Sequence, residues 1–203
     1  MHRLPFDTGI SAGRNHLLAR VDTPYLLLND DDRLFSRHTD LEVMVRLLDT
    51  CGLDVVGGRT WQRRRRHLYL VKSVVDTPVT LELDGETLRC VEVAVDERAA
   101  CTRCDLVPNF FVAPTGRIRA MGGWDARLKV DEHIDFFLRA KREGLAVGYT
   151  TRSSVDHVRG LERSRPRYLR FRQRAAEFRP FWMRSHGIST LINRHGTVIT
   201  APR

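Results

Sequence analysis

The pattern of apolar and polar positions up to residue 58 predicts helices and strands in alternation. Amphipathic helices are expected over Ser11–Val21 and over Thr39–Gly52, with Thr39 capping the second helix. Each helix precedes a short apolar run, at 24–29 and at 53–58, of the kind that forms a buried strand. This alternation indicates an α/β fold whose sheet contains parallel strands.

The rest of the chain changes from strands to helices. Residues 67–114 are rich in strand-forming side chains, and the Asp84–Gly85 pair is typical of a hairpin turn. A short helix is expected at 114–123, and a longer helix over Asp131–Gly144 is followed by a strand. Residues 165–185 alternate arginine with aromatic residues, which favours one or two helices. No internal repeat is present.

The chain carries a formal net charge of +9, and nearly all of its basic residues are arginine. Two basic clusters stand out, Arg63–Arg66 and Arg159–Arg174. A basic surface favours anionic partners such as nucleic acid, phosphorylated or acidic sugars and membrane headgroups, although a solvated face explains a single run equally well. The second cluster lacks any nucleic-acid motif, so nucleic acid is not the favoured partner. The tail is either a helix that packs its aromatic residues on the core or a basic face for an anionic membrane surface or lipid-linked acceptor.

Hydropathy and cysteine usage bear on the compartment. No apolar run reaches the ~20 residues that span a bilayer. Because a signal-peptide core is also missing, we expect either a cytoplasmic protein, free or associated with the inner face of the membrane, or a piece whose targeting segment lies elsewhere. Cys101 and Cys104 form a CxxC motif, which suits zinc or redox chemistry. No second pair follows and Cys51 and Cys90 stand alone, so ordinary or partly buried thiols are the preferred interpretation.

Three successive aspartates, Asp30–Asp32, follow the apolar strand YLLLN directly. In open α/β sheets, ligands bind beyond the carboxyl ends of the strands. A hard divalent cation relieves the repulsion among adjacent carboxylates and can bridge a substrate diphosphate. The alternative is a simple acidic turn, and the sequence leaves these two interpretations evenly balanced.

A second acidic cluster, formed by Asp131, Glu132 and Asp135, opens the predicted helix. The helix dipole favours acids in a first turn, which is a structural explanation. The functional interpretation is a general base that takes a proton from an acceptor hydroxyl. His157 closes the segment SSVDH and is either a structural histidine at a strand end or an imidazole ligand for Mn²⁺.

Three blocks of sequence, in this order, resemble the inverting nucleotide-sugar glycosyltransferases of the GT-A fold, and most closely the β-1,4-N-acetylgalactosaminyltransferase and family 2 group. The blocks are GISAGRNHLLARVDTPYLLLNDDDRLF, NFFVAPTGRIRAMGGWDARLKVDEHIDFFLRAKREGLAVGY and SSVDH. They cover most of Pro5–His157. The resemblance implies a mixed sheet flanked by helices in a partial glycosyltransferase domain over residues 1–160, followed by a basic aromatic helical tail over 161–203.

The resemblance also implies roles for individual residues. Mn²⁺ or Mg²⁺ would be bound by Asp32, with Asp30 and His157 as further ligands. Glu132 would be the catalytic base, with Asp131 as the alternate. The residues implied to bind the UDP-sugar donor are Arg14, Asn15, Asp30, Asp31, Gly123 and Trp124.

The implied reaction is a metal-dependent transfer with inversion, in which a hydroxyl of a glycan or glycolipid attacks the anomeric carbon of the sugar. The fold of the family begins with a strand–helix–strand unit that binds the nucleotide base. This unit is expected before FDTGISAGRN, where the sequence lacks it, so we expect an N-terminally truncated chain. The alternatives to an active enzyme are an inactive fragment, a pseudoenzyme with the same fold, or a basic protein that binds nucleic acid or an anionic surface.

Overall fold

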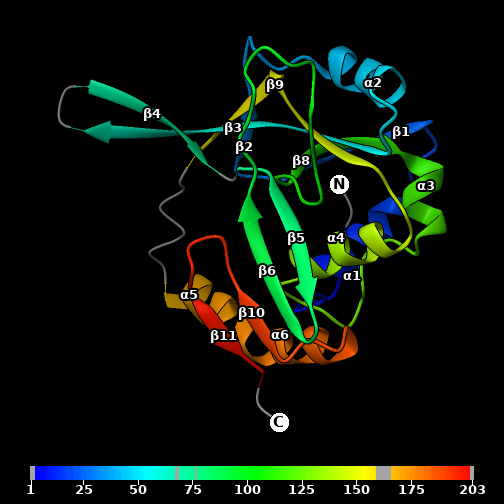
Figure 1. The fold of residues 1–203 in the computed structure, drawn as a ribbon, viewed down its shortest axis with the longest axis vertical. Helices are drawn as coiled ribbons and strands as arrows, with labels where there is room; N and C mark the ends of the chain where they lie inside the picture. The colour runs from blue at the N-terminus through cyan, green and yellow to red at the C-terminus, as the bar shows by residue number, and fades with distance from the viewer. Residues whose placement is uncertain (1–2, 67–68, 76, 159–165, 202–203) are drawn as a thin grey trace.

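The structure is a computed structural model that describes residues 3–66, 69–75, 77–158 and 166–201. These ranges contain six helices and eleven strands, and the strands form two mixed β-sheets (Figure 1). The prediction of a mixed α/β fold with flanking helices is confirmed. The predicted boundary between residues 160 and 161 lies outside the described residues.

The first sheet contains seven strands. Their bounds are β1 Tyr25–Asn29, β2 Arg33–Phe35, β3 Val55–Arg66, β4 Tyr69–Val75, β7 Thr102–Cys104, β8 Phe110–Pro114 and β9 Val147–His157. The main path runs β1-β8-β3-β9-β2, with β4 paired to β3 and β7 paired to β9. The β3–β4 hairpin extends away from the rest of the molecule (Figure 1). The side chains of the basic cluster Arg63–Arg66 are outside the described part of the structure.

The second sheet contains four strands in the order β11-β10-β6-β5. Their bounds are β5 Val79–Asp84, β6 Thr87–Glu92, β10 Thr190–Ile192 and β11 Val198–Thr200. The predicted hairpin is confirmed, because Asp84 pairs with Thr87 and Gly85 takes a φ of 54° in the turn between them. The parallel pairing of β6 with β10 attaches the C-terminal strands to this hairpin.

Parallel pairing within the described strands joins β3 to β9 and β6 to β10. The first sheet therefore contains parallel strands, as predicted, but its central strand β3 is parallel to β9 and antiparallel to β8. The strand β8 lies between β1 and β3 and is antiparallel to both. Its residues from Phe110 to Ala113 are all buried, so the sheet has a core on both faces.

The two faces of the first sheet belong to different hydrophobic clusters. The helices are α1 Ile10–Leu18, α2 Leu41–Thr50, α3 Thr115–Ala120, α4 His133–Arg142, α5 Pro166–Gln173 and α6 Ala175–Ser185. Because side chains alternate along a strand, Phe111 packs in the cluster that contains the apolar side chains of α4, whereas Phe110 packs under α2. The sheet is thus covered on one face by α2 and supported on the other by α4.

The start of α2 differs from the prediction. Asp40 is the cap, and its carboxylate accepts a hydrogen bond of 2.8 Å from the backbone N–H of Val43. Thr39 was the wrong choice because its hydroxyl donates to the carbonyl of Ser154 at 2.7 Å and so attaches the helix start to β9.

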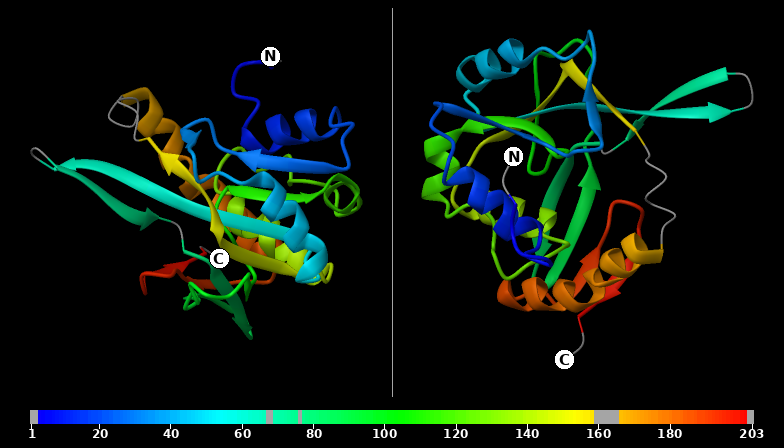
Figure 2. Two further views of the ribbon diagram at one scale, coloured as in Figure 1. Left: turned by 90° about the horizontal axis from the view of Figure 1, so that it is seen from above. Right: turned by 180° about the vertical axis from the view of Figure 1, so that it is seen from behind.

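The tail helices predicted within 165–185 are confirmed as α5 and α6. Both figures place α6 beside β10 and β11, at the end of the molecule away from α2 (Figures 1 and 2). Trp182 and Met183 of α6 are fully buried and pack in the same hydrophobic cluster as Phe136 of α4. The tail therefore contributes to the support of α4, whose N-terminus carries the second acidic cluster.

Candidate functional site

The turn Asp30–Asp32, here called the strand-end cluster, joins β1 to β2. Asp30 is directed inward: its Oδ1 accepts a hydrogen bond of 3.0 Å from Arg14, and its Oδ2 accepts one of 3.1 Å from Asn109. Asp32 contacts His157 instead. Asp31 is exposed to solvent. Three adjacent like charges therefore have three different surroundings.

His157, the last residue of β9, contacts both neighbouring strands. Its Nε2 lies 3.0 Å from Oδ2 of Asp32, and its Nδ1 lies 3.0 Å from Oε1 of Gln62. Gln62 reaches the ring because it lies opposite His157 in the β3–β9 register. A partner on one ring nitrogen fixes the direction of the other, so Gln62 orients Nε2 toward Asp32. The structure thus brings together two residues that are 125 positions apart.

Of the three predicted metal ligands, Asp32 and His157 lie in contact, whereas Asp30 has other partners. In the part of the chain that the structure describes, no three His, Cys, Asp or Glu side chains gather as a metal-binding group. Asp30 directs its two carboxylate oxygens to Arg14 and Asn109. Asp32 and His157 still offer one oxygen and one nitrogen, donors that Mn²⁺ accepts. This pair fits an ion that takes its other ligands from water and substrate phosphates.

Arg14 of α1 links the strand-end cluster to the acids at the start of α4. Its Nη1 donates to Oε1 of Glu132 at 2.7 Å, while its Nη2 donates to Asp30. The side chains of Arg14 and Glu132 are both only 8% exposed. The guanidinium is also 5.5 Å from the ring centre of Trp124. A rigid guanidinium fork that binds two carboxylates fixes the separation between them.

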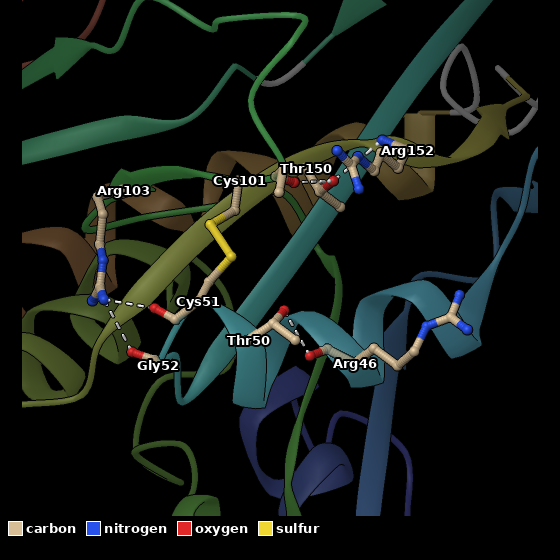
Figure 3. The surroundings of a disulfide bond; sticks show 9 residues. Arg46, Thr50, Cys51, Gly52, Cys101, Arg103, Thr150 and Arg152 are labelled. Atoms are coloured by element: carbon tan, nitrogen blue, oxygen red, sulfur yellow. Dashed lines mark hydrogen bonds between the residues drawn. A yellow bond between two sulfur atoms is a disulfide. The ribbon is translucent and has the colours of Figure 1, made fainter.

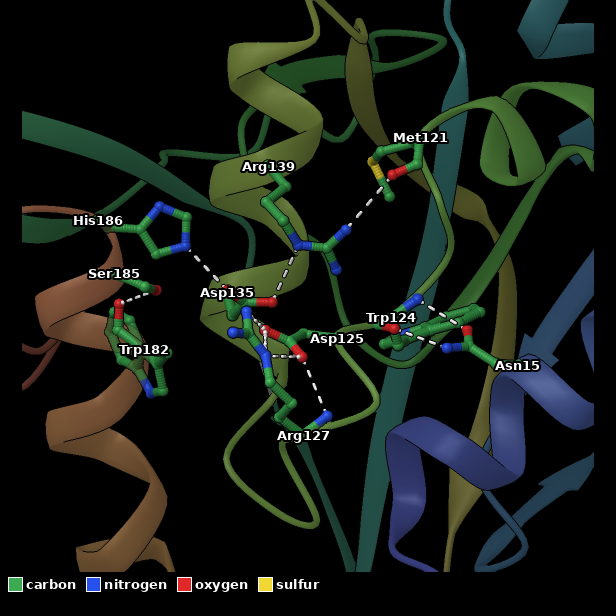
Figure 4. A network of polar contacts seen from close by, with 10 residues as sticks. All are labelled: Asn15, Met121, Trp124, Asp125, Arg127, Asp135, Arg139, Trp182, Ser185 and His186. Carbon is green, nitrogen blue, oxygen red and sulfur yellow. Dashed lines mark hydrogen bonds and ion pairs between the residues drawn. The ribbon is translucent and has the colours of Figure 1, made fainter.

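Asn15, the next residue of α1, binds the backbone of Trp124 from both sides (Figure 4). Its Nδ2 donates to the carbonyl at 2.6 Å, and its Oδ1 accepts from the N–H at 2.8 Å. Gly123 has a φ of 65°, and a Cβ there would lie 2.4 Å from Oδ1 of Asn15. Glycine is therefore required next to this clamp. Trp124 is buried and stacks on Phe136, so it forms a rigid wall beside Arg14.

Asp131, Glu132 and Asp135, here called the helix-start cluster, are held from α6 as well as from α1. Asp131 has a left-handed φ of 66°, which is unusual for a residue with a side chain. Its carboxylate accepts two hydrogen bonds of 2.8 Å from Arg179 and one of 3.0 Å from the indole of Trp182. The bond from Asp131 raises the pKa of Arg179. The alternate base of the sequence prediction is thus bound to the tail.

Asp135 forms the second connection between α4 and α6 (Figure 4). Its carboxylate accepts from Arg139 at 3.0 Å and lies 2.8 Å from Nε2 of His186. Asp135 and His186 are both buried. Taken with Asp131, this contact means that two of the three acids in the helix-start cluster position α6 against α4.

A third contact of the tail reaches the N-terminal segment. Asp7 accepts a hydrogen bond of 2.6 Å from Lys129 and one of 2.8 Å from Arg174. The bond from Lys129, with that from Arg174, lowers the pKa of Asp7. Arg174 and Arg179, both from the basic tail, therefore bind carboxylates of the chain itself.

The cysteines pair differently from the sequence expectation. Cys51, which the sequence left alone, forms a disulfide with Cys101 and links the end of α2 to the segment before β7 (Figure 3). Cys104 remains a thiol, and burial raises its pKa to about 12. A protonated thiol is a poor nucleophile and metal ligand, so the two cysteines of the CxxC motif do not act as a pair. Disulfides are typical of oxidising compartments, and the cytoplasmic location stays a prediction.

Sequence reasoning missed the residues that orient the predicted site. These are Gln62, Asn109, Arg179, Trp182 and His186. Asn109 lies just before β8, opposite the strand-end cluster, and only knowledge of the strand order would have indicated it.

No helix among the described residues is long and apolar enough to cross a bilayer.

Comparison with known proteins adds to this geometry. Rat beta-1,4 N-acetylgalactosaminyltransferase 1 is 34% identical over 158 residues, which are 76% of this chain and 29% of that protein. The chain is a homologue of the β-1,4 N-acetylgalactosaminyltransferases. The human enzyme 1 is 35% identical over 162 residues, 78% of this chain and 30% of that protein. Mouse enzyme 2 is 34% identical over 137 residues, 68% of this chain and 26% of that protein.

No family model matches the chain. The relationship to the β-1,4 N-acetylgalactosaminyltransferases bears out the resemblance in the sequence blocks, and these relatives are named as glycosyltransferases. The chain spans under a third of the length of the relatives that it matches.

Proposed function

We propose that the chain is a glycosyltransferase of the GT-A type that transfers an N-acetylhexosamine from a UDP-sugar to a hydroxyl of a glycan or glycolipid. The observation that carries this proposal is the position of Arg14. It joins Asp30, beside the Asp32–His157 pair, to Glu132. A leaving-group site and a base site are thereby held at a fixed separation, which an in-line displacement requires.

Asp32 and His157 would hold Mn²⁺ or Mg²⁺, with Gln62 keeping the imidazole in place. A bound divalent ion supplies Lewis-acid stabilisation of the departing diphosphate. Asp30 supports this site indirectly, because its carboxylate positions Arg14 and Asn109. The exposed Asp31 is the residue of the strand-end cluster that can reach a donor directly.

Glu132 is the proposed base. Among the described residues, the only hydrogen bond to its carboxylate comes from Arg14 to Oε1. Oε2 is therefore free to accept the proton of an acceptor hydroxyl as that hydroxyl attacks the anomeric carbon. Asp131 is less suited to this role because Arg179 and Trp182 together donate three hydrogen bonds to its carboxylate. Attack on one face of the sugar and departure from the other gives inversion.

The test separates binding from chemistry. Mn²⁺ with UDP should raise the melting temperature, and Asp32→Asn should remove this shift. Glu132→Gln should keep the shift and lower transfer from UDP-N-acetylgalactosamine by about a hundredfold or more, the usual contribution of a general base. Glu143→Gln, an exposed carboxylate at the other end of α4, is the matched control. A wild-type protein without any shift would mean that this chain does not bind the donor.

A further inference from the structure

A second polar region lies beside β9. It is a pocket of about 410 Å³. Its lining includes Arg37, Arg59, Trp61, Arg152 and Ser154. This volume lies within the range of sites that bind small molecules. None of these residues belongs to the proposed metal, donor or base set.

A bulge in β9 builds one wall of the pocket. Gly58 of β3 pairs with Thr150, but the next residue, Arg59, pairs with Ser154. Three residues of β9 therefore have no counterpart on β3, and Arg152 is among them. Bulges redirect side chains and are frequent next to functional sites. The irregularity in the sheet thus places an arginine at the pocket that a regular strand would have directed elsewhere.

The opposite wall is the loop before α2, and hydrogen bonds fix it to the same bulge. The backbone N–H of Ser154 donates to the carbonyl of His38 at 2.9 Å, and the hydroxyl of Thr39 donates to the carbonyl of Ser154 at 2.7 Å. The N–H of Asp40 donates to the hydroxyl of Ser153 at 2.9 Å. These bonds hold the pocket in a preformed shape, which lowers the entropy cost of binding.

Cationic groups outnumber acidic groups at the pocket. Arg59 pairs with Glu97, and its guanidinium carbon lies 5.2 Å from the ring centre of Trp61. Its Nε–H is nonetheless buried without an acceptor in the part of the chain that the structure describes. The lining also contains Asp40, whose carboxylate accepts from the N–H of Val43 as the cap of α2. Arg37 and Arg152 are exposed, and neither forms an ion pair with an acidic side chain in the part of the chain that the structure describes. The pocket therefore presents two cations outside any ion pair among the described residues, one unsatisfied donor, and a single acidic lining residue that already caps a helix.

We propose that this pocket binds the oxyanion of a small saccharide, a sugar that carries a carboxylate or a phosphate group. Guanidinium groups match the geometry of both oxyanions and bind them with charge-assisted hydrogen bonds. Trp61 supplies an apolar wall against which a sugar ring can pack. Inorganic phosphate has no such ring. Trp61 precedes Gln62, the partner of His157, along β3, and because side chains alternate along a strand the two point to opposite faces of the sheet. Binding here requires neither a metal ion nor a nucleotide.

Calorimetry on the whole chain, without metal or UDP, tests the proposal. The ligands are glucuronate, glucose 6-phosphate, inorganic phosphate and uncharged glucose. We expect the two sugar anions to bind, inorganic phosphate to bind more weakly, and glucose to show no binding. The shift of the Trp61 indole signal in NMR spectra should accompany binding. A preference between glucuronate and glucose 6-phosphate identifies which oxyanion the pocket is built for.

Charge reversals complete the test. Arg37→Glu and Arg152→Glu should each weaken the binding of sugar anions by about tenfold or more, since each removes a charge-assisted hydrogen bond. Arg89→Glu makes the same change at an exposed position of β6 and should leave the affinity unchanged. The proposal is overturned if glucose binds as well as glucuronate, if no sugar anion binds, or if both pocket variants keep wild-type affinity. All of these results are independent of whether UDP binds.

Discussion

The strand-end and helix-start clusters look alike in the sequence but differ in how the structure accommodates their charge. Each carboxylate of the helix-start cluster accepts a hydrogen bond from a cationic side chain, and Asp135 is only 2% exposed. In the strand-end cluster, the side chains of Asp30 and Asp32 remain 27% and 33% exposed, and Asp31 is open to solvent. Asp30 and Asp32 also have internal partners, Arg14 and His157, but both acids keep contact with water as well. The three acids of the strand-end cluster are all more exposed than those of the helix-start cluster, where Asp131, Glu132 and Asp135 are 21%, 8% and 2% exposed.

The largest expected effect on stability comes from removing Asp135, the most buried acid of the helix-start cluster. Asp135→Ala leaves His186 and Arg139 without their buried acceptor, and removing one partner of a buried pair costs about 3–5 kcal/mol. We expect this loss in the free energy of unfolding measured with urea. Asp135→Asn should cost less because the amide keeps an oxygen acceptor.

Asp84→Ala is the control for Asp135→Ala, since Asp84 is an exposed acid in the β5–β6 hairpin. It should change the free energy of unfolding by less than about 0.5 kcal/mol. If Asp135→Ala were as mild as the control, the helix-start cluster would not depend on its internal partners and the contrast between the clusters would disappear.

An intermediate effect is expected at Asp131. Asp131→Asn keeps a residue type that tolerates the left-handed backbone but removes the charge that Arg179 binds. We expect a loss of about 2 kcal/mol in the free energy of unfolding. A double-mutant cycle with Arg179→Ala should give a coupling energy of about 1–2 kcal/mol. Additive single and double variants would show that the Asp131–Arg179 pair does not help to dock the tail.

Much of the local structure could be predicted because its causes are local. Apolar periodicity indicated α2 and α4, and the Asp84–Gly85 pair indicated the hairpin. The order of strands could not be predicted, since the insertion of β8 between β1 and β3 is decided by contacts far apart in the sequence. The disulfide of Cys101, where the sequence predicted thiols, was missed for the same reason, because its partner Cys51 is 50 positions away in the sequence.

In the candidate site, too, some features could be predicted from the sequence and others could not. The resemblance indicated Asp32 and His157 as members of one site, and the structure places them in contact. Gln62 could not be predicted as their support, because a bulge in β9 sets which residue of β3 lies opposite His157. Arg179 could not be assigned to Asp131 either, since nothing local distinguishes it from the other arginines of the tail.

The smallest expected effect concerns Asp31, the solvent-exposed carboxylate of the strand-end cluster. Asp31→Asn removes one of three adjacent like charges, so in the absence of metal it should stabilise the protein by at most about 0.5 kcal/mol. The gain should shrink as salt is added, because screening weakens the repulsion between exposed charges. Urea unfolding at low and high ionic strength measures both quantities. A loss of stability greater than about 1 kcal/mol would instead reveal an internal partner for Asp31, and the strand-end cluster would then be balanced in the same way as the helix-start cluster.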